Sequence, residues 1–310
     1  MKPAASIVLF TTIAGAAQGV AVALAAATLA GRAPADALGP MLWVVTAMLV
    51  AALTASFFHL GHPLRAWRAV LMWRTSWMSR EVIVLPAFIS IVGAWAVLAT
   101  IAPARHDAGQ VFAWLAIAGA LVLWYCTAMI YACIRFIQEW AHPLTIVNYA
   151  MLGLASGLVT AGALGVIVGE IQFARDVGAW AVASTALAWL TRTLSLRRNA
   201  RLKPMSTVQS ATGINSGRVV QKAMGMTGGS FNTREFFHGV STSVMRNARL
   251  GFQVLAFGLP LALLSWAVLG GSGLGWVLAW AIQSLGMLAE RWFFFAQARH
   301  PQNIYYQVVS

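Results

Sequence analysis

The sequence predicts an all-α fold, that of a polytopic membrane protein with eight transmembrane helices. Of its 310 residues, 60% are hydrophobic and 9% are charged, and the mean hydropathy is +0.74. Soluble domains carry about 25% charged residues, so this balance is typical of a chain that lies mostly in lipid. In addition, apolar runs long enough to cross about 30 Å of hydrocarbon recur along the whole chain.

The eight apolar runs, taken in order, are each expected to form one membrane-spanning helix. They lie at about 6–31, 40–60, 82–102, 110–134, 143–168, 177–196, 250–270 and 273–298. The first run is too long to be typical of a removable signal peptide, so we expect it to remain as a helix. Pro40 and Pro143 stand at helix entrances, where a missing N–H costs nothing. The Gly-Gly-Ser-Gly segment at 270–273 predicts a tight turn, and hence an antiparallel hairpin of the last two helices.

The distribution of positive charge predicts the orientation of the bundle. An even number of spans places both termini on one side, and that side collects eighteen of the 21 Lys and Arg residues, Arg192 and Arg291 among them. The positive-inside rule makes this side cytoplasmic, in a bacterial inner (plasma) membrane. We treat residues 1–310 as a single membrane domain that contains a basic cytoplasmic loop at 197–249. Anionic lipid accounts for most of the net charge of +13, and no nucleic-acid-binding motif is present.

The histidines and cysteines do not favour a metal centre within the chain. A transmembrane relay of b-type haems needs imidazole pairs at two depths, yet every histidine except His106 falls on the predicted cytoplasmic side. We therefore expect no haem, although a lone axial pair of His59 with His142 stays open. Cys126 and Cys133, seven residues apart in the fourth run, are interpreted as packing residues rather than as a disulfide or a metal site.

The predicted spans have no charged residues near their middle. Transporters usually bind their cargo near the bilayer midplane through polar or ionisable residues, and the sequence shows no charge there. The fifth run contains small residues at a spacing that indicates close helix packing, namely Gly153, Ser156, Gly157 and Gly162. A transport site is accordingly disfavoured.

The stretch from Phe57 to Glu81 carries most of the polar chemistry. His59 ends the second run, and the sequence that follows alternates apolar and basic residues at helical spacing, which predicts a helix lying in the membrane interface. Ser79 is expected to cap the third helix. Glu81 would then fall in its first turn, where the helix dipole and Arg80 favour a carboxylate.

His59 and Glu81 form a titratable pair at one face of the membrane. A quinone needs an apolar slot and hydrogen-bonding groups that can exchange protons, and histidine suits that exchange near neutral pH. We take His59 and Glu81 as candidate catalytic residues and, with Arg65 on the polar face of the interfacial helix, as candidate quinone-binding residues. The simpler alternatives are that His59 is only a polar residue at the membrane interface and that Glu81 is only a negative charge at the start of a helix.

The sequence HLGHPLRAWRA at 59–69, followed by SREV at 79–82, resembles the signature of the DMSO reductase anchor-subunit family, and the similarity runs over most of the chain. Members are eight-helix, haem-free membrane anchors that hold a molybdopterin catalytic subunit and a four-cluster iron–sulfur subunit and exchange electrons with the quinone pool. The resemblance implies that His59 and Glu81 are the quinol-binding positions. It also implies that molybdopterin and iron–sulfur clusters lie only in the partner subunits.

Orientation separates the subclasses of this family. Respiratory DMSO reductases would present the His59 face to the periplasm, whereas the anchors of cytoplasmic sulfite-oxidising molybdoenzymes have the opposite orientation. In its basic face and long loop, this chain is similar to the latter, which implies that it passes electrons from sulfite oxidation into ubiquinone or menaquinone. The alternatives are the anchor of a DMSO or related reductase that oxidises menaquinol, and a transporter or purely structural tether. The loop at 197–249 is either a seat for the iron–sulfur partner or a solvated connector.

Overall fold

The computed structural model describes residues 2–34, 36–58, 60–220 and 239–301, and this part of the chain contains helices and no strand. The predicted all-α fold is therefore confirmed. The helices are α1 (Ala5–Leu29), α2 (Leu38–Phe57), the 3-10 helix η1 (Pro63–Met72), α3 (Trp77–Ile101), α4 (His106–Ala132), α5 (Pro143–Ile167), α6 (Ile171–Asn199), α7 (Val208–Thr212), α9 (Thr242–Gln253), the π-helical segment η2 (Val254–Gly258), α10 (Leu259–Gly270) and α11 (Gly273–Ala296).

Six helices are long and apolar enough to cross a membrane: α1 to α5 and the continuous rod from Thr242 to Gly270 that joins α9, η2 and α10. Helices α6 and α11 have 29 and 24 residues, but they are less apolar because charged side chains interrupt them. Six of the eight predicted spans thus meet the requirements of length and composition. Crossing by α6 and α11 stays a prediction.

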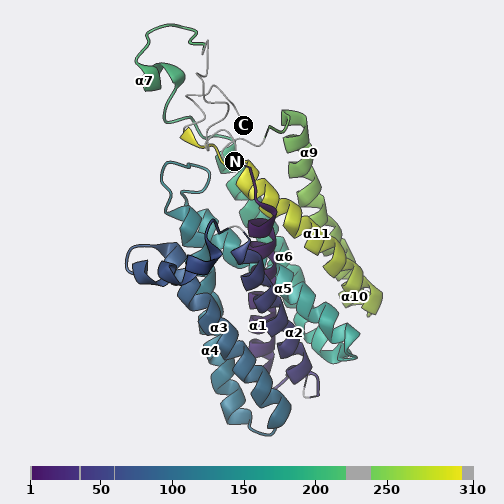
Figure 1. The fold of residues 1–310 in the computed structure, drawn as a ribbon. Helices are drawn as coiled ribbons and strands as arrows, with labels where there is room; N and C mark the ends of the chain where they lie inside the picture. The colour runs from purple at the N-terminus through teal and green to yellow at the C-terminus, as the bar shows by residue number, and fades with distance from the viewer. Residues whose placement is uncertain (1, 35, 59, 221–238, 302–310) are drawn as a thin grey trace.

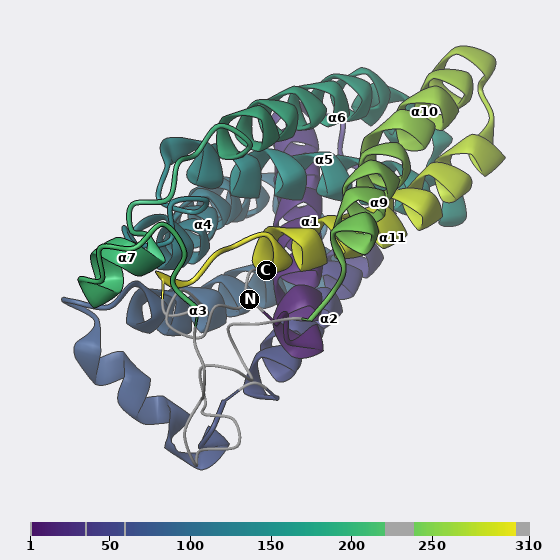
Figure 2. The ribbon, with the colours of Figure 1, turned by 90° about the horizontal axis from the view of Figure 1, so that it is seen from above.

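Helix α1 lies at the centre of the bundle and packs against α2, α4, α5 and α11. Figure 1 shows the α3–α4 pair on one side of α1 and the α5–α6 pair on the other, with α9, α10 and α11 outermost. Figure 2, from above, shows η1 projecting away from the bundle. Helices α10 and α11 form the predicted hairpin, in which Gly271 adopts a left-handed conformation (φ 65°) and Ser272 caps α11.

Two glycines let α1 and α5 cross in direct backbone contact. A Cβ atom on Gly157 would lie 2.3 Å from the Cα of Gly19, and a Cβ on Gly19 would lie 2.3 Å from the carbonyl oxygen of Gly153. Any side chain at these positions would push the helices apart. The close packing predicted from the small residues of the fifth run is confirmed.

Gly157→Ala is expected to destabilise the protein by roughly 1–3 kcal/mol, because backbone atoms of α1 cannot move aside as a flexible side chain would. The measurement is the thermal unfolding midpoint in detergent. Gly109→Ala is the matched control, since a Cβ on Gly109, in the first turn of α4, meets nothing within 4 Å. Equal midpoints for the two variants would show that the α1–α5 crossing relaxes without cost.

Candidate functional site

The chain enters α3 through a cap that differs from the predicted one. Ser76, in an extended conformation (φ −112°, ψ 127°), is the N-cap, and its hydroxyl oxygen accepts a hydrogen bond from the Ser79 N–H at 3.3 Å. The predicted cap at Ser79 is wrong by three residues, because Trp77 and Met78 already belong to the helix. Glu81 consequently lies beyond the first turn, roughly 6 Å along the helix from its start.

Glu81 is buried between α3 and α4. Its side chain is 8% exposed, and the hydroxyl of Thr127 on α4 donates a hydrogen bond to its carboxylate oxygen Oε1. Arg80 does not bind this carboxylate. Its guanidinium donates to the carbonyl oxygens of Trp73 and Arg74, at 2.9 Å each. The structure thus fixes Glu81 through a neutral hydroxyl, which the sequence did not reveal.

The other two predicted site residues are less closely tied to Glu81. His59 lies outside the described residues. Arg65 is exposed on η1, and among the described residues no hydrogen bond or ion pair joins it to Glu81. The predicted interfacial helix is a 3-10 helix in the structure, and it exposes large apolar side chains, Leu64, Trp67 and Leu71, beside its arginines. A short basic and apolar segment therefore connects the two candidate residues along the chain.

His142, the possible haem partner of His59, has a structural role at the start of α5. Its Nδ1 accepts a hydrogen bond from the Leu144 N–H at 3.1 Å and so caps the helix. Arg198, near the end of α6, donates a hydrogen bond to the carbonyl oxygen of Gln138 at 2.9 Å, and this bond connects α6 to the segment that precedes His142. Partial burial, with the positive charge of Arg198, lowers the pKa of His142 below its ordinary value. Both effects favour the neutral imidazole, the form whose Nδ1 can accept this hydrogen bond.

A cluster of three charged side chains is buried between α6 and α11. Glu290, which is 0% exposed, forms ion pairs with Arg192 and Arg291, each with an N–O distance of 2.6 Å. The Arg291 guanidinium also lies over the Tyr149 ring of α5, 4.4 Å from its centre. The cluster carries a net positive charge and is enclosed by aromatic rings.

This cluster corrects the charge assignment made from the sequence. Arg192 and Arg291 were counted among the positive residues of the predicted cytoplasmic side, but they lie inside the bundle and are 2% and 4% exposed. Without them the predicted cytoplasmic side still holds sixteen positive residues against three. The signal that could have found the cluster is an ionisable residue within an apolar run, which usually marks a paired or functional position.

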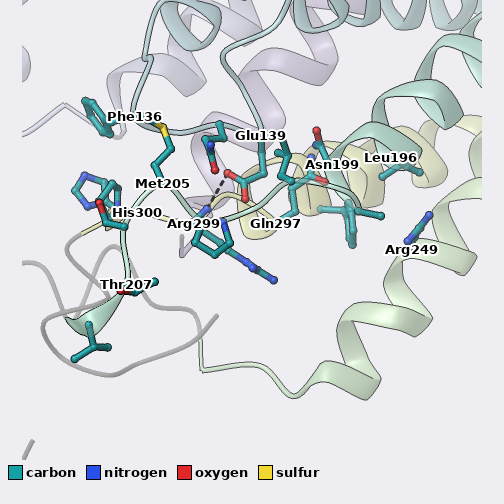
Figure 3. Close-up of a pocket in the computed structure, with 18 of the residues that line it drawn as sticks. Phe136, Glu139, Leu196, Asn199, Met205, Thr207, Arg249, Gln297, Arg299 and His300 are labelled. Atoms are coloured by element: carbon teal, nitrogen blue, oxygen red, sulfur yellow. Dashed lines mark hydrogen bonds between the residues drawn. The ribbon is translucent and has the colours of Figure 1, made fainter. Parts of the chain in front are cut away.

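An open pocket of about 590 Å³ lies where α6 and α11 end (Figure 3). Apolar side chains such as Phe136, Leu196 and Met205 line it together with charged ones, and the Glu139 carboxylate accepts a hydrogen bond from the Arg299 N–H at 3.4 Å. The pocket borders the first part of the predicted 197–249 loop, of which residues 221–238 lie outside the described residues. Such a mixed lining can accommodate a peptide segment or a small amphipathic molecule.

The fold defines a membrane-integral helical protein with a buried carboxyl group near one end of its bundle. The family model for the DMSO reductase anchor subunit (DmsC) matches residues 1–217, and the chain belongs to this family. It is also 46% identical, over an alignment of 328 residues that covers 100% of both chains, to a sulfite dehydrogenase subunit of Allochromatium vinosum. The resemblance recognised in the sequence is confirmed, and it places the chain among the membrane anchor subunits of molybdoenzymes.

Proposed function

We propose that this chain is the membrane anchor and quinone-reactive subunit of a complex iron–sulfur molybdoenzyme that oxidises sulfite. Its partners would be a four-cluster iron–sulfur subunit and a molybdopterin catalytic subunit, which hold all the metal cofactors. The observation that carries the proposal is the end-to-end match, at 46% identity, to a protein named as a subunit of sulfite dehydrogenase. Because the match covers both chains completely, it supports the proposal that this chain has the same position in its complex as that subunit has in sulfite dehydrogenase.

The proposed site would exchange the protons that accompany electron transfer to a quinone. Oxidation of sulfite to sulfate releases two electrons, and reduction of a quinone to a quinol takes up two electrons and two protons. Glu81 is buried near the start of α3, where a carboxyl group can deliver or accept a proton beside an apolar ring. We assign proton exchange to His59 and Glu81 and contact with the quinone head group to both of these and Arg65. The quinone would be ubiquinone or menaquinone, and no haem would take part.

A second function is favoured by the name of the family itself. The anchor of a DMSO or related reductase would use the same residues in the reverse direction, oxidising menaquinol. A transporter or a purely structural tether is a weaker alternative, because the ionisable residues buried within α6 and α11 bind one another. Membrane orientation separates the first two possibilities, since a cytoplasmic sulfite oxidation requires the docking face inside.

We propose eight spans with both termini in the cytoplasm, within one membrane-anchor domain at 1–310, and a basic cytoplasmic loop at 197–249. Alkaline phosphatase, which is active only in the periplasm, is expected to be active when fused after His106 and inactive when fused after Ser310. His106 begins α4, at the end of the bundle predicted to carry few positive charges. Activity from the Ser310 fusion would instead favour an outward-facing reductase.

His59→Ala is expected to abolish quinone-linked turnover of the assembled complex, while the soluble subunits still reduce an artificial dye with sulfite as donor. The complex is purified in mild detergent, which also identifies the co-purifying subunits. His62→Ala is the matched control, since His62 is an exposed histidine three residues away. Normal quinone-linked turnover in His59→Ala would remove this residue from the site, and co-purification without a molybdopterin subunit would refute the proposed function.

A further inference from the structure

A small, partly open cavity with several polar groups in its lining lies where α1, α4, α5 and α11 meet. It measures about 30 Å³ and is lined by polar side chains from all four helices, among them Gln18, Trp124, Thr127, Tyr149 and Arg291. One buried water needs about 10–15 Å³ and typically makes two to four hydrogen bonds. The cavity is therefore large enough for water and too small for a substrate.

Gln18 Oε1 and Trp124 Nε1 at this cavity have no hydrogen-bond partner, and the Tyr149 hydroxyl, which lies close to the donors Arg291 and Tyr131, has no acceptor for its own proton. Each of these side chains has at most 5% of its surface exposed. A buried polar group without a partner costs about 1–3 kcal/mol, and native proteins usually satisfy such groups with protein atoms or ordered water. One amide oxygen needs a donor here, and an indole N–H and a hydroxyl need an acceptor.

The hydroxyl group of Thr127, which lines the same cavity, donates its hydrogen bond to an unusual acceptor. Threonine hydroxyls within helices usually donate to the carbonyl oxygen four residues earlier, as Thr12 and Thr160 do here at 2.8 and 2.7 Å. The Thr127 hydroxyl instead donates to the carboxylate of Glu81. Its lone pairs then remain available to a donor in the cavity.

We propose that this cavity binds an ordered water that holds Thr127 in position to bind Glu81. The water donates hydrogen bonds to Gln18 Oε1 and Thr127 Oγ1, and it accepts them from the Trp124 N–H and the Tyr149 hydroxyl. Two donors and two acceptors of the protein match the four bonds that one water molecule can form. Gln18, Trp124 and Tyr149 are thus positioning residues, which act on Glu81 through the water and Thr127. This inference is independent of quinone reactivity.

The test is infrared spectroscopy of the full chain in lipid nanodiscs, at a pH low enough to protonate carboxyl groups. The chain contains only eight Asp and Glu residues, so the difference between the wild type and Glu81→Gln isolates the Glu81 carbonyl band. Thr127→Val should shift this band to higher wavenumber, because it loses a hydrogen bond. Tyr149→Phe and Gln18→Leu should shift it in the same direction, and neither should shift it further when combined with Thr127→Val.

Thr160→Val is the control, because it removes a buried hydroxyl that does not line the cavity. It should leave the Glu81 band in place. The proposal fails if Thr127→Val shifts the band while Tyr149→Phe and Gln18→Leu do not, and it fails equally if Thr127→Val has no effect. Should Gln18→Leu not fold, Tyr149→Phe decides alone, since it removes a single oxygen atom. No quinone is used, so the outcome is separate from the test of His59.

Discussion

Glu81→Gln is expected to lower quinone-linked turnover of the complex by about 10²- to 10⁴-fold, the usual contribution of a positioned acid or base. Glutamine keeps the size of the side chain and retains an oxygen that can accept the Thr127 hydrogen bond, but it cannot take up or release a proton. The measurement compares sulfite oxidation with quinone and with an artificial dye as electron acceptor. Only the quinone-linked rate should fall.

Glu170→Gln is the control for this prediction, because it changes a carboxyl group of the same kind at the opposite end of the bundle, immediately before α6. Its turnover should match that of the wild type. The amount of each variant in the membrane is measured by immunoblot. If Glu81→Gln reduced protein level and turnover to the same degree, Glu81 would be a structural residue rather than a participant in proton exchange.

Glu290→Gln is expected to destabilise the protein by about 3–5 kcal/mol, because it leaves Arg192 and Arg291 buried without a counter-charge. The measurement is the unfolding midpoint of the purified chain in detergent, together with its level in the membrane. Asp176→Asn is the matched control. Asp176 also belongs to an ion pair, with Arg32 at 4.0 Å, but the Arg32 side chain is 69% exposed and the pair is worth at most about 1 kcal/mol.

A second substitution in the same buried cluster tests the reason for the destabilisation predicted for Glu290→Gln. If its effect arises from unbalanced charge, removing Arg192 as well, in the double variant Arg192→Met with Glu290→Gln, should recover part of the lost stability. A double variant that is less stable than Glu290→Gln alone would mean that shape and packing, rather than charge, decide the stability of this region.

The apolar runs of the sequence located most of the helices because a bilayer requires long, continuous apolar segments. Helix α5, predicted at 143–168, spans Pro143–Ile167. The rod ending at Gly270 begins at Thr242, eight residues before the predicted start, since its first turns are basic and amphipathic rather than apolar. Periodicity also anticipated that 63–72 is helical, but not that it is a 3-10 helix.

Partners distant in sequence could not be predicted in this way. Thr127 lies 46 residues after Glu81, and Glu290 lies 98 residues after Arg192. No local pattern shows which side chain a buried polar group will meet across a helix interface. The Ser76 cap was missed for a different reason, because Ser76 and Ser79 both fit the cap preference and only the backbone conformation distinguishes them.

The separation of Arg192 from Glu290 along the chain imposes an order on the synthesis of this protein. At about 5–20 residues per second, Glu290 is made roughly 5–20 s after Arg192. During that interval α6 has no acidic partner for its arginine, and an isolated helix that carries an unpaired arginine enters a bilayer poorly. If α6 crosses the membrane as proposed, we therefore expect its stable insertion to follow the release of α11 from the ribosome, so a helix made late in synthesis would complete the membrane topology of one made well before it.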